Sequence, residues 1–362
     1  MTTSTTNELL VQRLFEVVNE GKRDATYKLA LLLGLIDWVT THAGASKAPT
    51  SELAESVLNI YFRQVSPYVS KKEEKTLKQG KQKRILIIEV VASLRNDHPE
   101  CNRLQQIQHK SPEAYLKARD QVEQVLVAQP IPRLQRVGGK EIPFLYSCSW
   151  KPKQSLGPLR NSGLDFIELK PGVRERLVVM GPLLRPVIEA IWVADVASWS
   201  KIETEEENLR VHLFGTERTT FPLEVREGLH KLHSNKCFYC SAEVPEGLAV
   251  DHFIPWSRFP NDAIENLVMS CTPCNSKKSD HLASPFFLKK WLERLEDPAL
   301  TAIALKSGWE SNPTRARAIA SSIYRSVAID SVVWGGSKTF HVISEADVDY
   351  ITELFAVDLT EE

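Results

Sequence analysis

Long hydrophobic runs, an excess of charge of one sign and internal repeats are all lacking in this sequence of 362 residues. The longest apolar run, Leu29–Ile36, is far shorter than the roughly 18–20 residues that a membrane-spanning helix needs. The polar, Thr-rich segment Met1–Asn7 has no charged-then-apolar pattern of the kind found in signal peptides. We therefore expect a soluble cytoplasmic protein with no membrane partner.

The charge balance excludes a strongly basic chain, because 45 Lys and Arg residues face 46 Asp and Glu residues. Any surface that binds nucleic acid must therefore be local. Lys71–Arg84 is dense in charge, and two interpretations stay open for it: a solvated surface, which we favour, or a contact with a DNA backbone. The sequence has no P-loop, helicase motif or Gly-rich nucleotide loop, so we expect no use of ATP.

Six cysteines are present, and four of them form two Cys-x-x-Cys pairs, Cys237–Cys240 and Cys271–Cys274, while Cys101 and Cys148 stand alone. In a cytoplasmic chain such pairs indicate metal or redox sites. Two pairs separated by 30 residues can present four thiolates in the tetrahedron that zinc prefers. No βαβ pattern surrounds them, which disfavours a thioredoxin-like site. We therefore predict a structural zinc site.

The length suggests two or three domains, at about 100–200 residues each. Helical periodicity dominates residues 1–200, for which we expect a mainly helical region that recognises a target or regulates, with a hairpin at about 133–147. The acidic stretch Lys201–Glu207 is our preferred boundary. We expect a module at 208–290 and a C-terminal helical packing region at 291–362.

Candidate catalytic side chains lie between the two cysteine pairs and directly after the second pair. Asp251 offers a hard oxygen ligand suited to Mg²⁺, and His252 offers a base whose pKa is ordinarily near neutrality. Asn266 and Asn275 carry amides that can orient an imidazole or bind a metal. Together these four residues favour a hydrolytic site.

The local structure around Asp251 and His252 constrains how they can act together. Leu248–Phe253 has the apolar alternation of a short strand, in which neighbouring side chains point to opposite faces. The two residues can share one site only at a distortion or a strand end. Pro255 and Trp256 indicate that the strand ends there.

In this order, Cys-x-x-Cys, Asp-His, Asn and Cys-x-x-Cys-Asn resemble the HNH endonucleases of the ββα-metal fold, over about residues 236–281. The resemblance implies an α+β chain: a largely helical N-terminal domain, then an HNH module with structural zinc, then a helical layer. It implies that Asp251 and Asn275 bind a catalytic Mg²⁺ or Mn²⁺. It also implies that His252 is the general base and that Asn266 orients it.

The last position of the motif is Asn275 here and His in some relatives, so His281 is an additional candidate ligand. Arg258, Lys277 and Lys278 flank the motif and are candidate nucleic-acid contacts, although exposed charge without such a role is an equal alternative for each.

The segments Ala25–Asp37 and Ile142–Tyr146 resemble parts of bacterial restriction and anti-phage nucleases that contain HNH modules. This resemblance implies an endonuclease in restriction or antiviral defence that cuts double-stranded DNA, with a defence-system protein as a candidate partner. Because one site cuts one strand, a double-strand break favours a homodimer. Two alternatives stay open: an HNH nuclease that acts on RNA, and a zinc ribbon that binds nucleic acid or protein without cutting.

Overall fold

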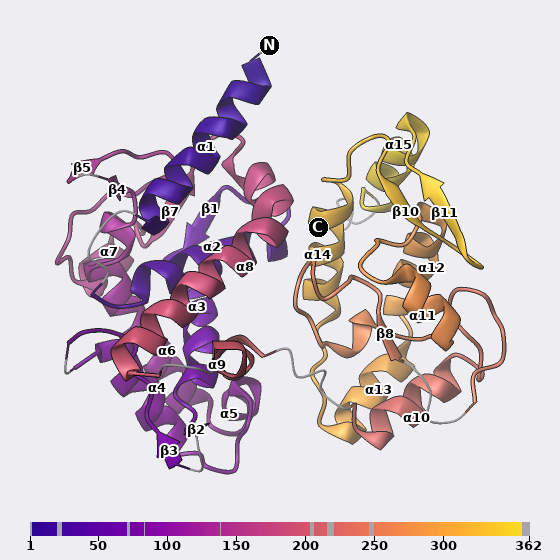
Figure 1. Cartoon of the computed structure of the whole chain (residues 1–362), viewed down its shortest axis with the longest axis horizontal. Coiled ribbons are helices and arrows are strands. Elements are labelled where there is room, and N and C mark those ends of the chain that lie inside the picture. The colour runs from indigo at the N-terminus through magenta and orange to yellow at the C-terminus, as the bar shows by residue number, and fades with distance from the viewer. Residues whose placement is uncertain are drawn as a thin grey trace. The chain divides into compact units, whose positions relative to one another are not determined.

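The computed structural model describes residues 2–19, 24–70, 73–82, 84–137, 139–202, 206–215, 221–245 and 250–356. The chain divides into two compact units (Figure 1). The first unit consists of Met1–Val39 and Gly44–Glu217, and the second consists of Thr40–Ala43 and Arg218–Glu362. Each unit has its own hydrophobic core.

Helices and small antiparallel sheets make up both units, which confirms the α+β class. The helices are α1 Thr2–Asn19, α2 Tyr27–Thr41, α3 Thr50–Gln64, α4 Leu86–Asn96, α5 Leu104–Lys110, α6 Pro112–Ala128, η1 Ile131–Arg133, α7 Leu156–Asn161, α8 Val173–Ser200, α9 Glu206–Phe214, α10 Leu223–Leu232, η2 Ile264–Asn266, α11 Thr272–Lys278, α12 Pro285–Leu295, α13 Pro298–Ser307, α14 Pro313–Tyr324 and α15 Glu345–Leu354. The strands are β1 Lys47–Pro49, β2 Tyr68–Ser70, β3 Glu73–Lys75, β4 Arg136–Val137, β5 Lys140–Glu141, β6 Tyr146–Ser147, β7 Phe166–Leu169, β8 Val250–His252, β9 Leu267–Met269, β10 Val332–Gly336 and β11 Thr339–Val342.

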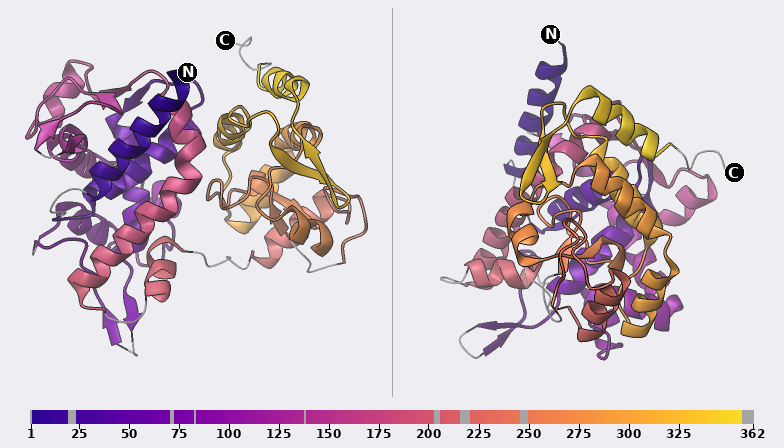
Figure 2. Two further views of the ribbon diagram at one scale, coloured as in Figure 1. Left: turned by 45° about the horizontal axis from the view of Figure 1, so that its top comes forward. Right: turned by 90° about the vertical axis from the view of Figure 1, so that its right-hand side faces the viewer.

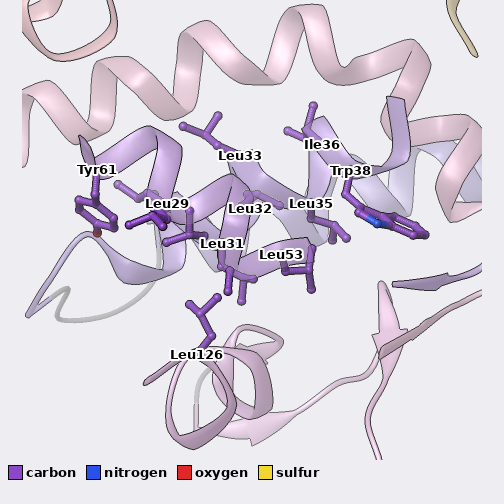
Figure 3. Close-up of a cluster of buried hydrophobic side chains, with 14 of the residues drawn as sticks. Leu29, Leu31, Leu32, Leu33, Leu35, Ile36, Trp38, Leu53, Tyr61 and Leu126 are labelled. Carbon is purple, nitrogen blue, oxygen red and sulfur yellow. The ribbon is translucent and has the colours of Figure 1, made fainter. Parts of the chain in front are cut away.

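Helix α2 forms the centre of the first unit. Its residues are apolar almost all round, and Leu29, Leu33 and Ile36 are each at most 2% exposed. Figure 3 shows these side chains pointing in several directions from α2, toward neighbours that include Leu53 of α3 and Leu126 of α6. A helix without a polar face is stable only when other elements surround it. The first unit is therefore built around α2.

Helix α8 contains two prolines in its interior, Pro182 and Pro186. A proline inside a helix costs about 3 kcal/mol, but Leu177, Ile188 and Trp192 are buried in the core along its length. By length and composition α8 could cross a membrane. A core helix passes the same test, and α8 has one buried face, so it carries no argument for a membrane.

The hairpin expected at about 133–147 is present in a shorter form. Strands β4 and β5 pair antiparallel, with Arg136 opposite Glu141, and Gly138 in their turn lies outside the described residues. Strand β6 instead joins a sheet of order β1-β7-β6. A second hairpin, β2–β3, lies at the margin of the first unit in both views of Figure 2.

The division between the units lies further along the chain than the expected boundary at Lys201–Glu207, of which residues 203–205 lie outside the described part. Helix α9 packs with α8 and α3. The Arg63 Nε atom of α3 also donates to the His212 backbone oxygen of α9 at 3.2 Å. These contacts place α9 in the first unit.

The second unit joins the expected module at 208–290 and the region that follows it in one core. Phe253 stacks on Trp291 of α12 with 4.9 Å between ring centroids, and it also packs on Tyr324 of α14. Trp334 of β10 is fully buried in the same cluster. In the described part of the chain, the helices after residue 291 are thus integral to the fold around the site.

Candidate active site and metal centre

Four cysteines from the two Cys-x-x-Cys turns converge on one point. Their sulfur atoms all lie within 4.8 Å of one another, and the Cys240 and Cys271 sulfurs are 3.7 Å apart. A tetrahedral zinc site with Zn–S bonds of about 2.3 Å places its sulfurs about 3.8 Å apart. The cluster of Cys237, Cys240, Cys271 and Cys274 therefore fits structural zinc.

The backbone around these cysteines holds the cluster closed. The Cys237 amide donates to the Ala242 oxygen at 2.8 Å, and the Phe238 amide donates to the Met269 oxygen of β9 at 2.8 Å. Although burial opposes ionisation of Cys237, hydrogen bonds from the backbone of Cys271, Cys240 and Tyr239 outweigh it and lower the pKa of the Cys237 thiol. A lowered pKa favours the thiolate at this position, which is the form that binds metal, whereas burial raises the pKa of the Cys271 and Cys274 thiols.

His230 and His233, which precede the first Cys-x-x-Cys turn, contact groups outside the cysteine cluster. The His230 Nε2 atom is 2.7 Å from the Val244 oxygen. Burial, together with the nearby Arg294 guanidinium, lowers the pKa of His233 to about 3, and Arg294 lies 3.3 Å from the His233 Nε2 atom. His233 is thus a neutral packed residue, and neither histidine is needed to complete the four-sulfur set.

Strands β8 and β9 and helix α11 follow one another as a ββα unit at the centre of the second unit (Figure 1). In the antiparallel pair, Asp251 lies opposite Val268 and His252 lies opposite Leu267. Strand β8 ends at His252, one residue before the end of the predicted strand Leu248–Phe253, whose residues 248 and 249 lie outside the described part of the chain. Cys271 precedes the first residue of α11, so the second Cys-x-x-Cys turn directly sets the start of that helix.

Asp251 is buried and bonded on its Oδ2 atom by two neighbours. The Tyr239 hydroxyl donates to it at 2.8 Å, and the Lys278 Nζ atom lies 3.0 Å away. Burial, reinforced by the negative charge of Asp251, raises the pKa of Tyr239 well above its usual value, so the phenol keeps its proton. The Asp251 carboxylate is therefore fixed in position by the Tyr239 hydroxyl and paired with the Lys278 ammonium.

The position of Lys278 contradicts the expectation that it contacts phosphate directly. Its side chain is 0% exposed, and its Nζ atom also donates to the His252 backbone oxygen at 2.8 Å. A fully buried ammonium needs compensation of this kind. Lys278 ties the end of α11 to β8.

His252 faces a different set of partners from its neighbour Asp251. Its Nε2 atom lies 2.8 Å from the Asp262 Oδ1 atom. The rings of Phe221 and Trp256 lie 5.7 Å and 5.4 Å from the imidazole centroid. The imidazole is 23% exposed, so it is accessible to a substrate while three side chains hold it.

Asn266 does not orient His252 by direct contact, contrary to the expectation from the motif. Its side chain accepts from the Ile254 amide at 2.8 Å and donates to the Ile254 and Asn261 oxygens at 3.1 Å and 2.9 Å. Because it is fully buried and bonds both ends of the segment after β8, Asn266 fixes the loop 254–261.

The remaining predicted residues lie on or beside α11 and the loop after β8. Asn275 is half-buried on α11, and Arg258 and Lys277 are exposed. The His281 Nδ1 atom lies 3.1 Å from the Lys278 oxygen, and its ring contacts Phe340. The end of the helix and an aromatic neighbour thus account for the placement of His281 without a metal.

Asp251 and Asn275 carry the types of donor that Mg²⁺ prefers, a carboxylate and an amide oxygen. However, the Oδ2 atom of Asp251 already carries the Tyr239 hydroxyl and the Lys278 ammonium. A divalent ion held by Asp251 would compete with these two partners for the carboxylate. The fit to a catalytic metal is therefore weaker than the fit of the cysteines to zinc.

Two residues of the site were missed by the sequence reasoning, Asp262 and Tyr239. Tyr239 sits inside the first Cys-x-x-Cys turn, and Asp262 follows His252 by ten residues in an irregular segment. No spacing rule connects either residue to the Asp-His pair. Only the folded loop brings the Asp262 carboxylate to the imidazole.

Comparison with known proteins agrees with this geometry. Residues 237–281 match the model of the HNH endonuclease family. The second unit therefore contains a segment that is similar to HNH endonuclease domains.

A known protein is also similar to part of this chain. Septu protein PtuB from Bacillus thuringiensis is 36% identical over 62 residues, which are 16% of this chain. The match spans 24% of the length of that relative.

Proposed function

We propose that this chain is a metal-dependent endonuclease that hydrolyses phosphodiester bonds in double-stranded DNA. The observation that carries the proposal is the ββα unit, in which the cysteine cluster lies at the start of α11, Lys278 of α11 bonds to β8, and a partly exposed His252 ends that strand. A binding module has no need of a histidine held in this way. The exposed Arg258 and Lys277 supply positive charge for the phosphate backbone.

The proposed reaction begins with proton transfer to His252. Its imidazole takes a proton from a water molecule, whose oxygen forms a bond to phosphorus while the bond from phosphorus to the 3′ oxygen breaks. A general base of this kind contributes typically about 10²–10⁴-fold to the rate. A Mg²⁺ or Mn²⁺ ion held by Asp251 and Asn275 would supply charge stabilisation for the phosphate and the leaving oxygen.

The proposed setting is bacterial restriction or anti-phage defence in the cytoplasm, with a homodimer or a partner protein of a defence system. Two resemblances support it: the similarity to a Septu protein and that of Ala25–Asp37 and Ile142–Tyr146 to restriction and anti-phage nucleases. Since one site cuts one strand, two copies would give a double-strand break.

The proposed activity is tested by incubating the purified full chain with duplex DNA, single-stranded DNA and RNA of one sequence. We expect Mg²⁺ or Mn²⁺ to support cleavage of duplex DNA, giving 5′-phosphate ends, and EDTA to abolish it. Cleavage of RNA alone would replace the proposed substrate. Binding of every probe with cleavage of none would favour a non-catalytic zinc ribbon.

A further inference from the structure

The contact between His252 and Asp262 has a chemical consequence for the proposed base. A carboxylate accepts hydrogen bonds, so at 2.8 Å from Asp262 the Nε2 atom of neutral His252 is the one that carries hydrogen. The Nδ1 atom is then left with its lone pair. We infer that Asp262 is a positioning residue that fixes the tautomer and orientation of His252, an assignment that rests on the proposed nuclease function.

Asp262 is itself held by the region that follows the HNH motif. Its backbone oxygen accepts from the Trp309 Nε1 atom at 2.6 Å. Two residues later, the Ile264 amide donates to the Glu310 oxygen at 2.9 Å. These two bonds anchor both sides of Ala263 to the turn after α13. The Asp262 carboxylate thus projects from a loop that these hydrogen bonds hold in place. A residue that orients another side chain needs such support.

The motif residue Asn266 contributes from the other side of the same loop. It bonds the Asn261 oxygen at 2.9 Å and both backbone groups of Ile254. Asn261 directly precedes Asp262, and its own side chain accepts from the Ala263 amide at 3.1 Å. Asn266 therefore shapes the loop, and Asp262 makes the contact with the imidazole.

Aromatic rings restrict the remaining freedom of the imidazole. Phe221 and Trp256 contact His252 at tilted angles, and Phe221 also packs edge-on against Trp309 with 6.0 Å between centroids. Trp309 thus supports both Phe221 and Asp262. One carboxylate fixes which nitrogen carries hydrogen, and the rings fix the plane in which the other nitrogen is presented.

Asp262→Asn is the variant that tests this role, because it keeps the shape and allows the amide to donate to Nε2. We expect kcat for cleavage of duplex DNA to fall about 10–100-fold, as for other residues that orient a histidine, with KM changed less than twofold. Asp349→Asn, an exposed carboxylate on α15, removes the same charge and serves as control.

The His252→Ala background separates positioning from a direct role. If Asp262 acts through His252, Asp262→Asn lowers the residual rate of His252→Ala by less than twofold. A further 10–100-fold loss would mean that Asp262 acts on the metal or substrate itself and would overturn the assignment. An unchanged kcat in the single variant would overturn it as well.

A spectroscopic measurement keeps the inference testable even if no substrate is cut. In protein with ¹⁵N-labelled histidine, the ring signals of His252, assigned by their loss in His252→Ala, should show hydrogen on Nε2 in the wild type. Asp262→Asn should shift the population toward hydrogen on Nδ1. The same tautomer in both proteins would contradict the inference, whereas an inactive wild type with the expected signals would contradict only the proposed function.

Discussion

Replacing Cys274 with serine is expected to release the bound zinc and unfold the second unit while the first unit stays folded. Cys237 and Cys274 are buried members of the second core, and the cluster joins the turn before β8 to the start of α11. Loss of a structural metal belongs to the changes that exceed about 4 kcal/mol. The total free energy of unfolding of a folded domain is only about 5–15 kcal/mol.

Calorimetry and metal analysis of the same samples measure this effect. We expect one zinc per wild-type chain and two unfolding transitions, of which only that of the second unit moves down or disappears in Cys274→Ser. Cys148→Ser, at a half-buried thiol of the first unit, is the matched control and should keep the zinc. Retained zinc and unchanged transitions in Cys274→Ser would refute a structural role for the cluster.

Lys278→Met is expected to lower the free energy of unfolding of the second unit by about 3–5 kcal/mol, the range for breaking a buried ion pair. Methionine keeps an apolar stem of similar length but leaves Asp251 buried without its ammonium partner. The Nζ atom lies 3.0 Å from Asp251. Its second bond, to the His252 oxygen, is also lost.

Denaturant unfolding of three variants isolates the ion pair. Lys277→Met, an exposed neighbour on α11, should change the free energy of unfolding by no more than about 0.5 kcal/mol. Asp251→Asn/Lys278→Met should recover much of the lost stability, because no unpaired charge remains. Equal changes in the free energy of unfolding for Lys277→Met and Lys278→Met would show that the buried ion pair does not stabilise the second unit.

The parts of the site that the sequence predicted are those whose chemistry is local. Two residues between paired cysteines suffice to form a metal-binding turn, and Pro255 after Asp251-His252 suffices to end a strand. These features therefore appear in the structure where the spacing placed them.

The parts that the sequence did not predict depend on contacts between distant segments. Lys278 was taken for a surface charge because its burial against Asp251 exists only once α11 packs on β8. Asp262 reaches His252 only because Trp309 and Asn266 shape its loop. Similarly, Pro182 and Pro186 locally disfavour a helix interior, but burial along α8 outweighs that preference.

Cleavage of supercoiled plasmid by the wild type and by His252→Ala, with Mg²⁺ present, tests the central claim most directly. The account predicts nicking by the wild type and a rate at least about 100-fold lower for the variant, with zinc content and unfolding transitions unchanged. Equal nicking by both proteins would contradict His252 as the general base. Absence of nicking by the zinc-loaded, folded wild type on this substrate would contradict the proposed activity of the chain on DNA by itself.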